Sequence, residues 1–248
     1  MYQYGTDFYD YLAQSSVRSA KGAVPQVVSL IQPKSVLDVG CGAGAWLSVY
    51  VKAGVNDYVG VDGPYVRLEQ LLIDRGRFVP KDVAAPFDLQ RSFDLVQCLE
   101  VGEHVVTAKS KGLVDNIVRH GRLALFGAAI PGQGGENHIN EQTYEFWRGL
   151  FRSHGFVPLD ALRPLIRGKL EVEPWYRFNA IFYAHESIVD KLPAAMRSAR
   201  VPDGVPIASV APLSYRLRCA LLRVLPSSVV TQLAMIKHRL TVRPVKGT

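Results

Sequence analysis

The sequence predicts an α/β fold in which a mainly parallel sheet carries helices on both faces. Short apolar runs alternate along the chain with stretches of helical periodicity. The apolar run at residues 36–39 ends in a glycine-rich turn, and residues 45–51 continue at helical spacing. Strand, tight turn and helix in this order open a βαβ unit, because glycines let the backbone turn sharply and lie close to a ligand.

The other strands are predicted where apolar runs lie between turn residues. In chain order they cover residues 57–61, 78–80, 93–100, 121–127, 156–162 and 177–184, the last two as an antiparallel pair at the sheet edge. Helices are predicted at residues 65–75, in a stretch ending at Val118, and after Asn140, a candidate N-cap. The expected sheet therefore has seven strands.

Three regions are expected. Residues 1–32 form an N-terminal helical cover made of two helices, residues 33–186 form the cofactor-binding domain, and residues 187–248 form a linker and a basic helical extension. The extension is expected to hold amphipathic helices at 213–225 and 229–240. Residues 204–248 contain seven of the 29 Lys and Arg residues and none of the 22 acidic ones. The preceding part of the chain is therefore electrically neutral.

Two ligands compete for the glycine-rich turn. Residues 40–45 satisfy the G-x-G-x-x-G/A fingerprint of dinucleotide-binding folds. Asp38 favours another ligand, because a carboxylate there repels a pyrophosphate and attracts the ammonium of a cationic, amino-acid-bearing cofactor. Asp38, Gly40, Gly42 and Gly44 together resemble the first motif of the class I S-adenosylmethionine-dependent methyltransferases, acid-x-Gly-x-Gly-x-Gly. Residues 99–105 resemble the fourth-strand motif of the same superfamily.

This resemblance covers about two thirds of the chain and implies a Rossmann-like sheet that binds S-adenosylmethionine. Asp38 and the three glycines would hold the amino-acid end of the cofactor. Asp62, at the end of the second strand, can accept hydrogen bonds from both ribose hydroxyls. The resemblance further implies that Asp82 binds the adenine amino group, and we expect Leu99 and Glu100 to line the remaining side.

The expected reaction is methyl transfer, a step in which most of the rate gain comes from positioning. Residues 138–156 resemble methyltransferases of glycan and secondary-metabolite pathways, which implies O-methylation of a hydroxyl on a sugar, lipid-linked glycan or other small metabolite. A hydroxyl acceptor benefits from a general base. The candidates are His138, in the loop after the fifth strand, and His104.

A metal-dependent alternative rests on Glu100, Glu103 and His104. With the distant His138, this E-x-x-E-H cluster resembles the metal site of small-RNA 3′-terminal 2′-O-methyltransferases and could hold a hard divalent cation. Alternatively, Glu103 stabilises a first helical turn and His104 packs beside the cofactor. We favour the second interpretation and assign no metal ligand. A metal-dependent RNA 2′-O-methyltransferase is thus the first rival function, and a catalytically silent methyltransferase-like subunit is the second.

Composition and charge set the expected partners and location. The three cysteines form no metal-ligand pattern and suit a reducing compartment, and no long apolar span is visible, so a cytoplasmic location is expected. The basic tail is predicted to lie on the anionic inner face of a membrane. Homodimerisation or packing on the domain comes next. Nucleic-acid binding is disfavoured, because Tyr215 is the only aromatic residue of the tail.

Overall fold

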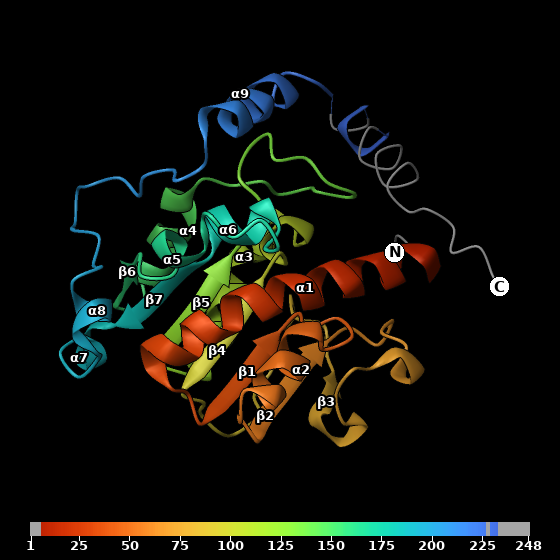
Figure 1. The fold of residues 1–248 in the computed structure, drawn as a ribbon, viewed down its shortest axis with the longest axis vertical. Helices are drawn as coiled ribbons and strands as arrows, with labels where there is room; N and C mark the ends of the chain where they lie inside the picture. The colour runs from red at the N-terminus through yellow and green to blue at the C-terminus, as the bar shows by residue number, and fades with distance from the viewer. Residues whose placement is uncertain (1–5, 227–228, 233–248) are drawn as a thin grey trace.

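A computed structural model describes residues 6–226 and 229–232 of the chain. Its centre is a seven-stranded sheet of order β3-β2-β1-β4-β5-β7-β6 (Figure 1). The strands are β1 Ser35–Val39, β2 Asp57–Asp62, β3 Phe78–Pro80, β4 Leu95–Leu99, β5 Leu123–Gly127, β6 Phe156–Leu159 and β7 Ile181–His185. β7 is antiparallel to both of its neighbours, and the other pairs are parallel. The predicted fold class and the closing antiparallel pair are confirmed.

Helices cover both faces of this sheet, and α1 lies across the front in Figure 1. One face carries α1 Thr6–Ile31, α2 Ala45–Lys52, α5 Arg163–Ile166 and α6 Pro174–Asn179, and the other carries α3 Ser110–Arg119 and α4 Tyr144–Arg152. Each face has its own apolar core: Val24 and Leu47 belong to the first, Leu113 and Phe151 to the second. The chain continues with α7 Glu186–Val189, α8 Ala194–Arg197 and α9 Leu213–Leu222.

Two helix predictions are wrong. The N-terminal cover is one helix that runs through Pro25, because the buried residues Ala23, Val24 and Val27 hold it against the core on both sides of the proline. Residues 65–75 form no α-helix but hold separate 3₁₀ turns, at Leu68–Gln70 and Arg75–Arg77. The Leu72 N–H donates to the Ala43 carbonyl at 2.8 Å, which ties this stretch to the glycine-rich turn instead.

Two further boundaries differ from the prediction. Asn140 does not cap α4; that cap is Thr143, whose side chain accepts a hydrogen bond from the Phe146 N–H. Asn140 is buried and donates to the Gly102 carbonyl and the Ser110 hydroxyl, so it joins two loops. The last strand begins at Ile181 rather than at residue 177, because residues 174–179 form α6.

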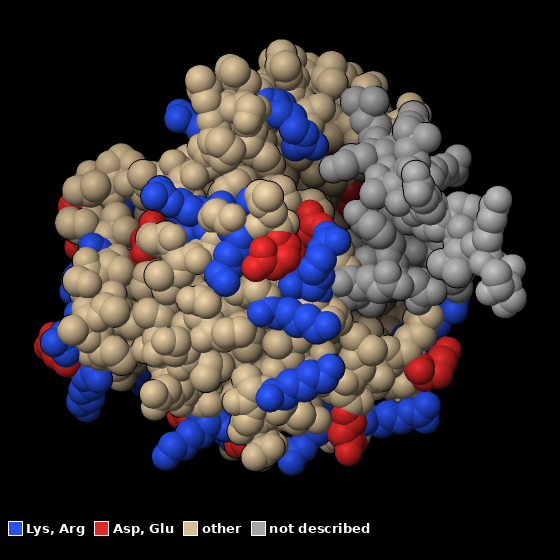
Figure 2. All heavy atoms as spheres, viewed as in Figure 1, with Lys and Arg blue, Asp and Glu red and all other residues tan. Residues whose placement is uncertain are grey.

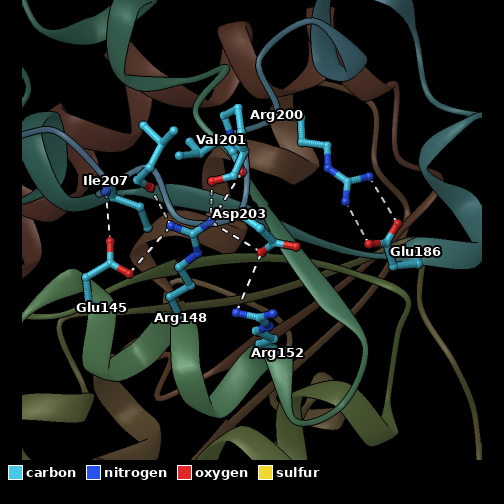
Figure 3. A network of polar contacts seen from close by, with 10 residues as sticks. Glu145, Arg148, Arg152, Glu186, Arg200, Val201, Asp203 and Ile207 are labelled. Carbon is cyan, nitrogen blue, oxygen red and sulfur yellow. Dashed lines mark hydrogen bonds and ion pairs between the residues drawn. The ribbon is translucent and has the colours of Figure 1, made fainter.

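The predicted linker is packed onto the domain as far as Ala211, which is buried. Arg148 on α4 donates to the Val205 and Pro202 carbonyls at 2.7 Å each, and the neighbouring Glu145 accepts from the Ile207 N–H at 2.8 Å (Figure 3). Most of the second predicted tail helix lies outside the described residues. Among the described helices, none is long and apolar enough to cross a bilayer.

Arg148→Met tests how much this anchoring stabilises the fold. The substitution removes both short hydrogen bonds; the Pro202 carbonyl keeps the Val205 N–H as a donor, but the Val205 carbonyl loses its arginine donor. We therefore expect a loss of about 2–4 kcal/mol in the free energy of unfolding. Arg152→Met is the matched control, because Arg152 is 65% exposed and makes only a 3.8 Å ion pair with Asp203. Its expected change is within about 0.5 kcal/mol. Equal losses in urea denaturation would contradict the assignment.

Candidate active site

The glycine-rich turn lies at the carboxyl end of β1, where a parallel sheet forms its ligand crevice. Gly40, Gly42 and Gly44 all have positive φ, at 82°, 53° and 80°. A Cβ at Gly40 would lie 2.2 Å from the Val101 side chain, whereas a Cβ at Gly42 would meet no described atom within 4 Å. The turn thus packs on one side and borders open space on the other. α2 begins directly after it with no side-chain cap from the described residues, so its first N–H groups remain available.

Two buried carboxylates flank the turn. Burial raises the pKa of Asp38 to about 7; a hydrogen bond with Gln97 opposes this shift, and the charge of Asp62 adds to it. Asp62 accepts hydrogen bonds from the Gly42 and Gly63 N–H groups at 2.6 Å each and from the Tyr65 hydroxyl at 2.5 Å. Burial raises the pKa of Asp62 despite these bonds. Asp62 therefore fastens the turn to β2.

These residues fit an aminoacyl nucleoside cofactor. Asp38 is a buried carboxyl whose charged form lacks solvation, which favours a cationic ligand beside it. The Tyr65 hydroxyl on Asp62 shows that this carboxylate can accept from an O–H group, as a ribose hydroxyl requires. The structure brings Asp38, Asp62 and the three glycines together. Asp82 is exposed and accepts from the Ala84 N–H within its own turn, so its adenine role stays a prediction.

β4 ends in Leu99, which is buried, and Glu100, which has a φ of +55°. Left-handed backbone is uncommon outside glycine, and such residues gather at functional sites. One Glu100 carboxylate oxygen accepts from the Gln133 side chain at 2.9 Å, and the other has no hydrogen-bond partner within the described part of the chain. Burial, and after it the charge of Glu103, raises the pKa of Glu100 well above its usual range.

Glu103, His104 and His138 form a cluster beside this point. Their possible ligand atoms lie within 4.8 Å of one another. The two imidazole rings are arranged edge to face, with ring centroids 5.1 Å apart. Glu103 is fully buried, and neither of its carboxylate oxygens has a hydrogen-bond partner among the described residues. The predicted candidates His104 and His138, distant in sequence, are therefore adjacent in space.

The hydrogen bonds of the two histidines fix which ring nitrogen carries the proton. His104 Nδ1 lies 3.1 Å from the Asn137 carbonyl oxygen, and His138 Nδ1 lies 2.9 Å from the Glu141 carboxylate. Since both partners only accept, each Nδ1 is the donor, and the neutral ring keeps its lone pair on Nε2. Burial lowers the pKa of His104, which favours this neutral form.

Sequence reasoning missed two residues that shape the site. Glu141 accepts from His138 and from the Gly132 and Gly134 N–H groups; although burial alone would raise its pKa, these bonds hold that pKa below its ordinary value. Gln133 links Glu100 to Asn179, whose side chain donates to it at 2.7 Å. The position of Glu141 three residues after His138 was the available signal. For Gln133 the sequence carries no comparable signal.

Comparisons with known proteins agree with this geometry. A family model described as a methyltransferase domain matches residues 14–122. An O-methyltransferase family protein from Burkholderia thailandensis superposes with a TM-score of 0.52 and 13% identity, covering 72% of this chain and 58% of its own. DesVI from Streptomyces venezuelae superposes with a TM-score of 0.51 and 14% identity, and the match covers 74% of this chain and 99% of DesVI. The mitomycin 7-O-methyltransferase MmcR superposes with a TM-score of 0.50 and 14% identity, and the match covers 71% of this chain and 55% of MmcR. No curated protein sequence matches significantly.

The sheet order, the glycine-rich turn after β1 and the acid ending β2 define an enzyme fold that binds a nucleoside cofactor. A methyltransferase-domain family thus matches residues 14–122, and the fold agrees with that of the class I S-adenosylmethionine-dependent methyltransferases. These findings support S-adenosylmethionine as the cofactor and methyl transfer as the class of reaction. The chain spans only 58% of the Burkholderia protein, and at 13–14% identity the neighbours show the fold alone.

Asp38→Asn is expected to stabilise the protein without cofactor above pH 7. The raised pKa means that folding opposes ionisation of Asp38, so wild-type stability falls as pH rises from the ordinary value of 3.8 to about 7. Raising this pKa from 3.8 to about 7 corresponds to an upper limit of about 4 kcal/mol in the free energy of unfolding. Urea denaturation at pH 8 should show a gain of about 1–4 kcal/mol, shrinking by more than half at pH 5. A variant less stable than wild type at pH 8 would rule out this explanation.

Tyr65→Phe is expected to tighten S-adenosylmethionine binding by about three- to tenfold, because the hydroxyl that competes for Asp62 is removed. Calorimetric titration measures this directly. Tyr58→Phe, within β2, is the control and should leave the affinity unchanged. Weaker binding by Tyr65→Phe would mean that the hydroxyl itself holds the cofactor.

Proposed function

We propose that the chain methylates a hydroxyl oxygen of a sugar, a lipid-linked glycan or another small metabolite. The observation that carries this proposal is the pair His104 and His138, each with an Nε2 lone pair, beside the cofactor turn. Val101 packs on Gly40 and immediately precedes the 3₁₀ turn Gly102–His104, so the two parts of the site adjoin. An acceptor hydroxyl placed between them has a base within reach.

S-adenosylmethionine supplies the electrophilic methyl group when it is bound. The chain has two tasks: to align the acceptor oxygen with that methyl group and to take the hydroxyl proton. His138 Nε2 suits the second task, because the Glu141 carboxylate on Nδ1 orients the ring and stabilises the imidazolium that forms. The neighbours described as O-methyltransferases support an oxygen acceptor, and the neutral charge of residues 1–203 favours a small molecule over RNA.

Methyl transfer assisted by a divalent cation at the same cluster is the second candidate function. The sequence analysis assigned no metal ligand, but one observation favours a cation here. Glu100 and Glu103 lie close together and bury three unpaired carboxylate oxygens among the described residues. Two such carboxylates need either a shared proton or a cation between them. Glu103 and the Nε2 atoms of His104 and His138 would hold the cation, with Glu100 beside them. Its chemistry would be to lower the pKa of a bound hydroxyl.

His138→Gln tests the proposed base. With S-adenosylmethionine and a panel of hydroxyl and amine acceptors, mass spectrometry should detect methylated hydroxyl products, and the variant should lower kcat by about 10²- to 10⁴-fold with unchanged cofactor affinity. His154→Gln is the control, because this histidine pairs with Asp115 away from the cluster. Methylation of amines alone, or full activity of His138→Gln, would overturn the proposal.

Chelation separates the two candidates. If a cation is bound, EDTA should abolish turnover, Mg²⁺ or Mn²⁺ should restore it, and Glu103→Gln should eliminate calorimetric Mg²⁺ and Mn²⁺ binding. Glu136→Gln is the control, because Glu136 is a half-buried acid of the same loop that lies outside the cluster. Unchanged activity in EDTA would leave the shared proton as the explanation.

A further inference from the structure

α9 has two apolar faces, and within the described part of the chain one of them contacts the domain while the other is exposed. On the inner face, Tyr215 packs against Phe178 with ring centroids 5.1 Å apart, and Cys219 is buried. On the outer face four large apolar side chains are exposed, spaced three or four residues apart so that they share one helical stripe. They are Leu213, Leu217 and Leu221, with Val224 in the turn directly after α9, and they are between 57% and 80% exposed.

The charges around this outer stripe have one sign. Arg216 and Arg223 lie on exposed positions at its border, and residues 204–248 contain no Asp or Glu. Figure 2 shows basic groups and no acidic ones on the α9 ridge at the top of the molecule. The same composition continues in the sequence to Lys246.

We propose that the outer face of α9 docks on the surface of an anionic lipid bilayer. Exposed aliphatic side chains enter the boundary between headgroups and acyl chains, while arginines beside them attract anionic headgroups. Nucleic acid fits less well, because it is held by stacking on aromatic side chains and Tyr215 faces Phe178 instead. Residues 204–248 carry positive charges and no negative ones, and this charge is complementary to an anionic lipid surface. We therefore propose the lipid surface as the partner of this helix face.

The inner face connects this docking surface to the site. Cys219 lies so close to Gly132 that a Cβ added at Gly132 would be 2.0 Å from the Cys219 carbonyl oxygen. The Arg218 guanidinium donates a hydrogen bond to the Gln133 carbonyl oxygen at 2.9 Å. Gln133 in turn donates to Glu100. Membrane docking would therefore hold the loop that carries His138 at the lipid surface, where a lipid-linked acceptor is found. Docking itself does not depend on which acceptor is methylated.

Vesicle cosedimentation of the full chain tests the proposal. Phosphatidylcholine vesicles with about 30% phosphatidylglycerol should bind the wild type, pure phosphatidylcholine should bind it at least tenfold more weakly, and salt should weaken binding to the anionic vesicles. Leu217→Ser with Leu221→Ser should reduce the partition coefficient at least tenfold. Arg216→Gln with Arg223→Gln should reduce binding to the anionic vesicles specifically.

Leu170→Ser is the matched control, because Leu170 is 83% exposed and lies outside α9. It should bind vesicles like the wild type. Absence of vesicle binding, or equal binding by the Leu217/Leu221 variant, would overturn the proposal. So would self-association in light scattering that this variant abolishes without any lipid effect, since a second copy of the chain would then be the occupant. Cofactor affinity, measured on the same variants, reports the fold independently.

Discussion

The structure depends on a concentration of carboxyl groups at the carboxyl ends of three neighbouring strands. Asp38 on β1, Asp62 on β2, and Glu100 and Glu103 after β4 are withdrawn from water within an otherwise neutral catalytic region. Burying ionised carboxylates is costly unless they are paired. Asp62 is stabilised by two backbone N–H groups and a hydroxyl, but the others lack such a set. Binding of a positively charged group at the carboxyl ends of these strands would therefore be favourable.

In the proposed account, a cationic cofactor would meet this requirement at Asp38, and either a proton or a divalent cation would meet it at Glu100 and Glu103. The free-energy cost of burying these carboxyl groups is offset by stabilising contacts elsewhere in the fold. Two apolar cores pack on the two faces of the sheet, and Arg148 holds the segment after α8 against α4. Glu100 adopts a left-handed backbone conformation directly after β4, close to the glycine-rich turn, and for a residue other than glycine this conformation is strained. Stability and function thus compete at the same residues.

The sequence predicted the fold class, the strands on either side of the glycine-rich turn and the turn itself, because these follow from local periodicity and backbone freedom. It failed where tertiary contacts decide. Residues 65–75 have helical periodicity, yet Leu72 pairs with Ala43; Asn140 resembles a cap, yet it is buried between loops. The adjacency of His104 and His138 depends on how the loop after β5 folds back, which no local pattern specifies. Glu141 and Gln133 act only within that loop.

The central claim is that Asp38 loses its proton when a cation binds beside it. Calorimetry of S-adenosylmethionine binding at pH 7, in two buffers with different ionisation enthalpies, measures this most directly. Because the pKa of Asp38 is raised to about 7, binding should release roughly half a proton per site, and Asp38→Asn should abolish the release. Absence of binding, or binding by the wild type with no proton release, would contradict the account.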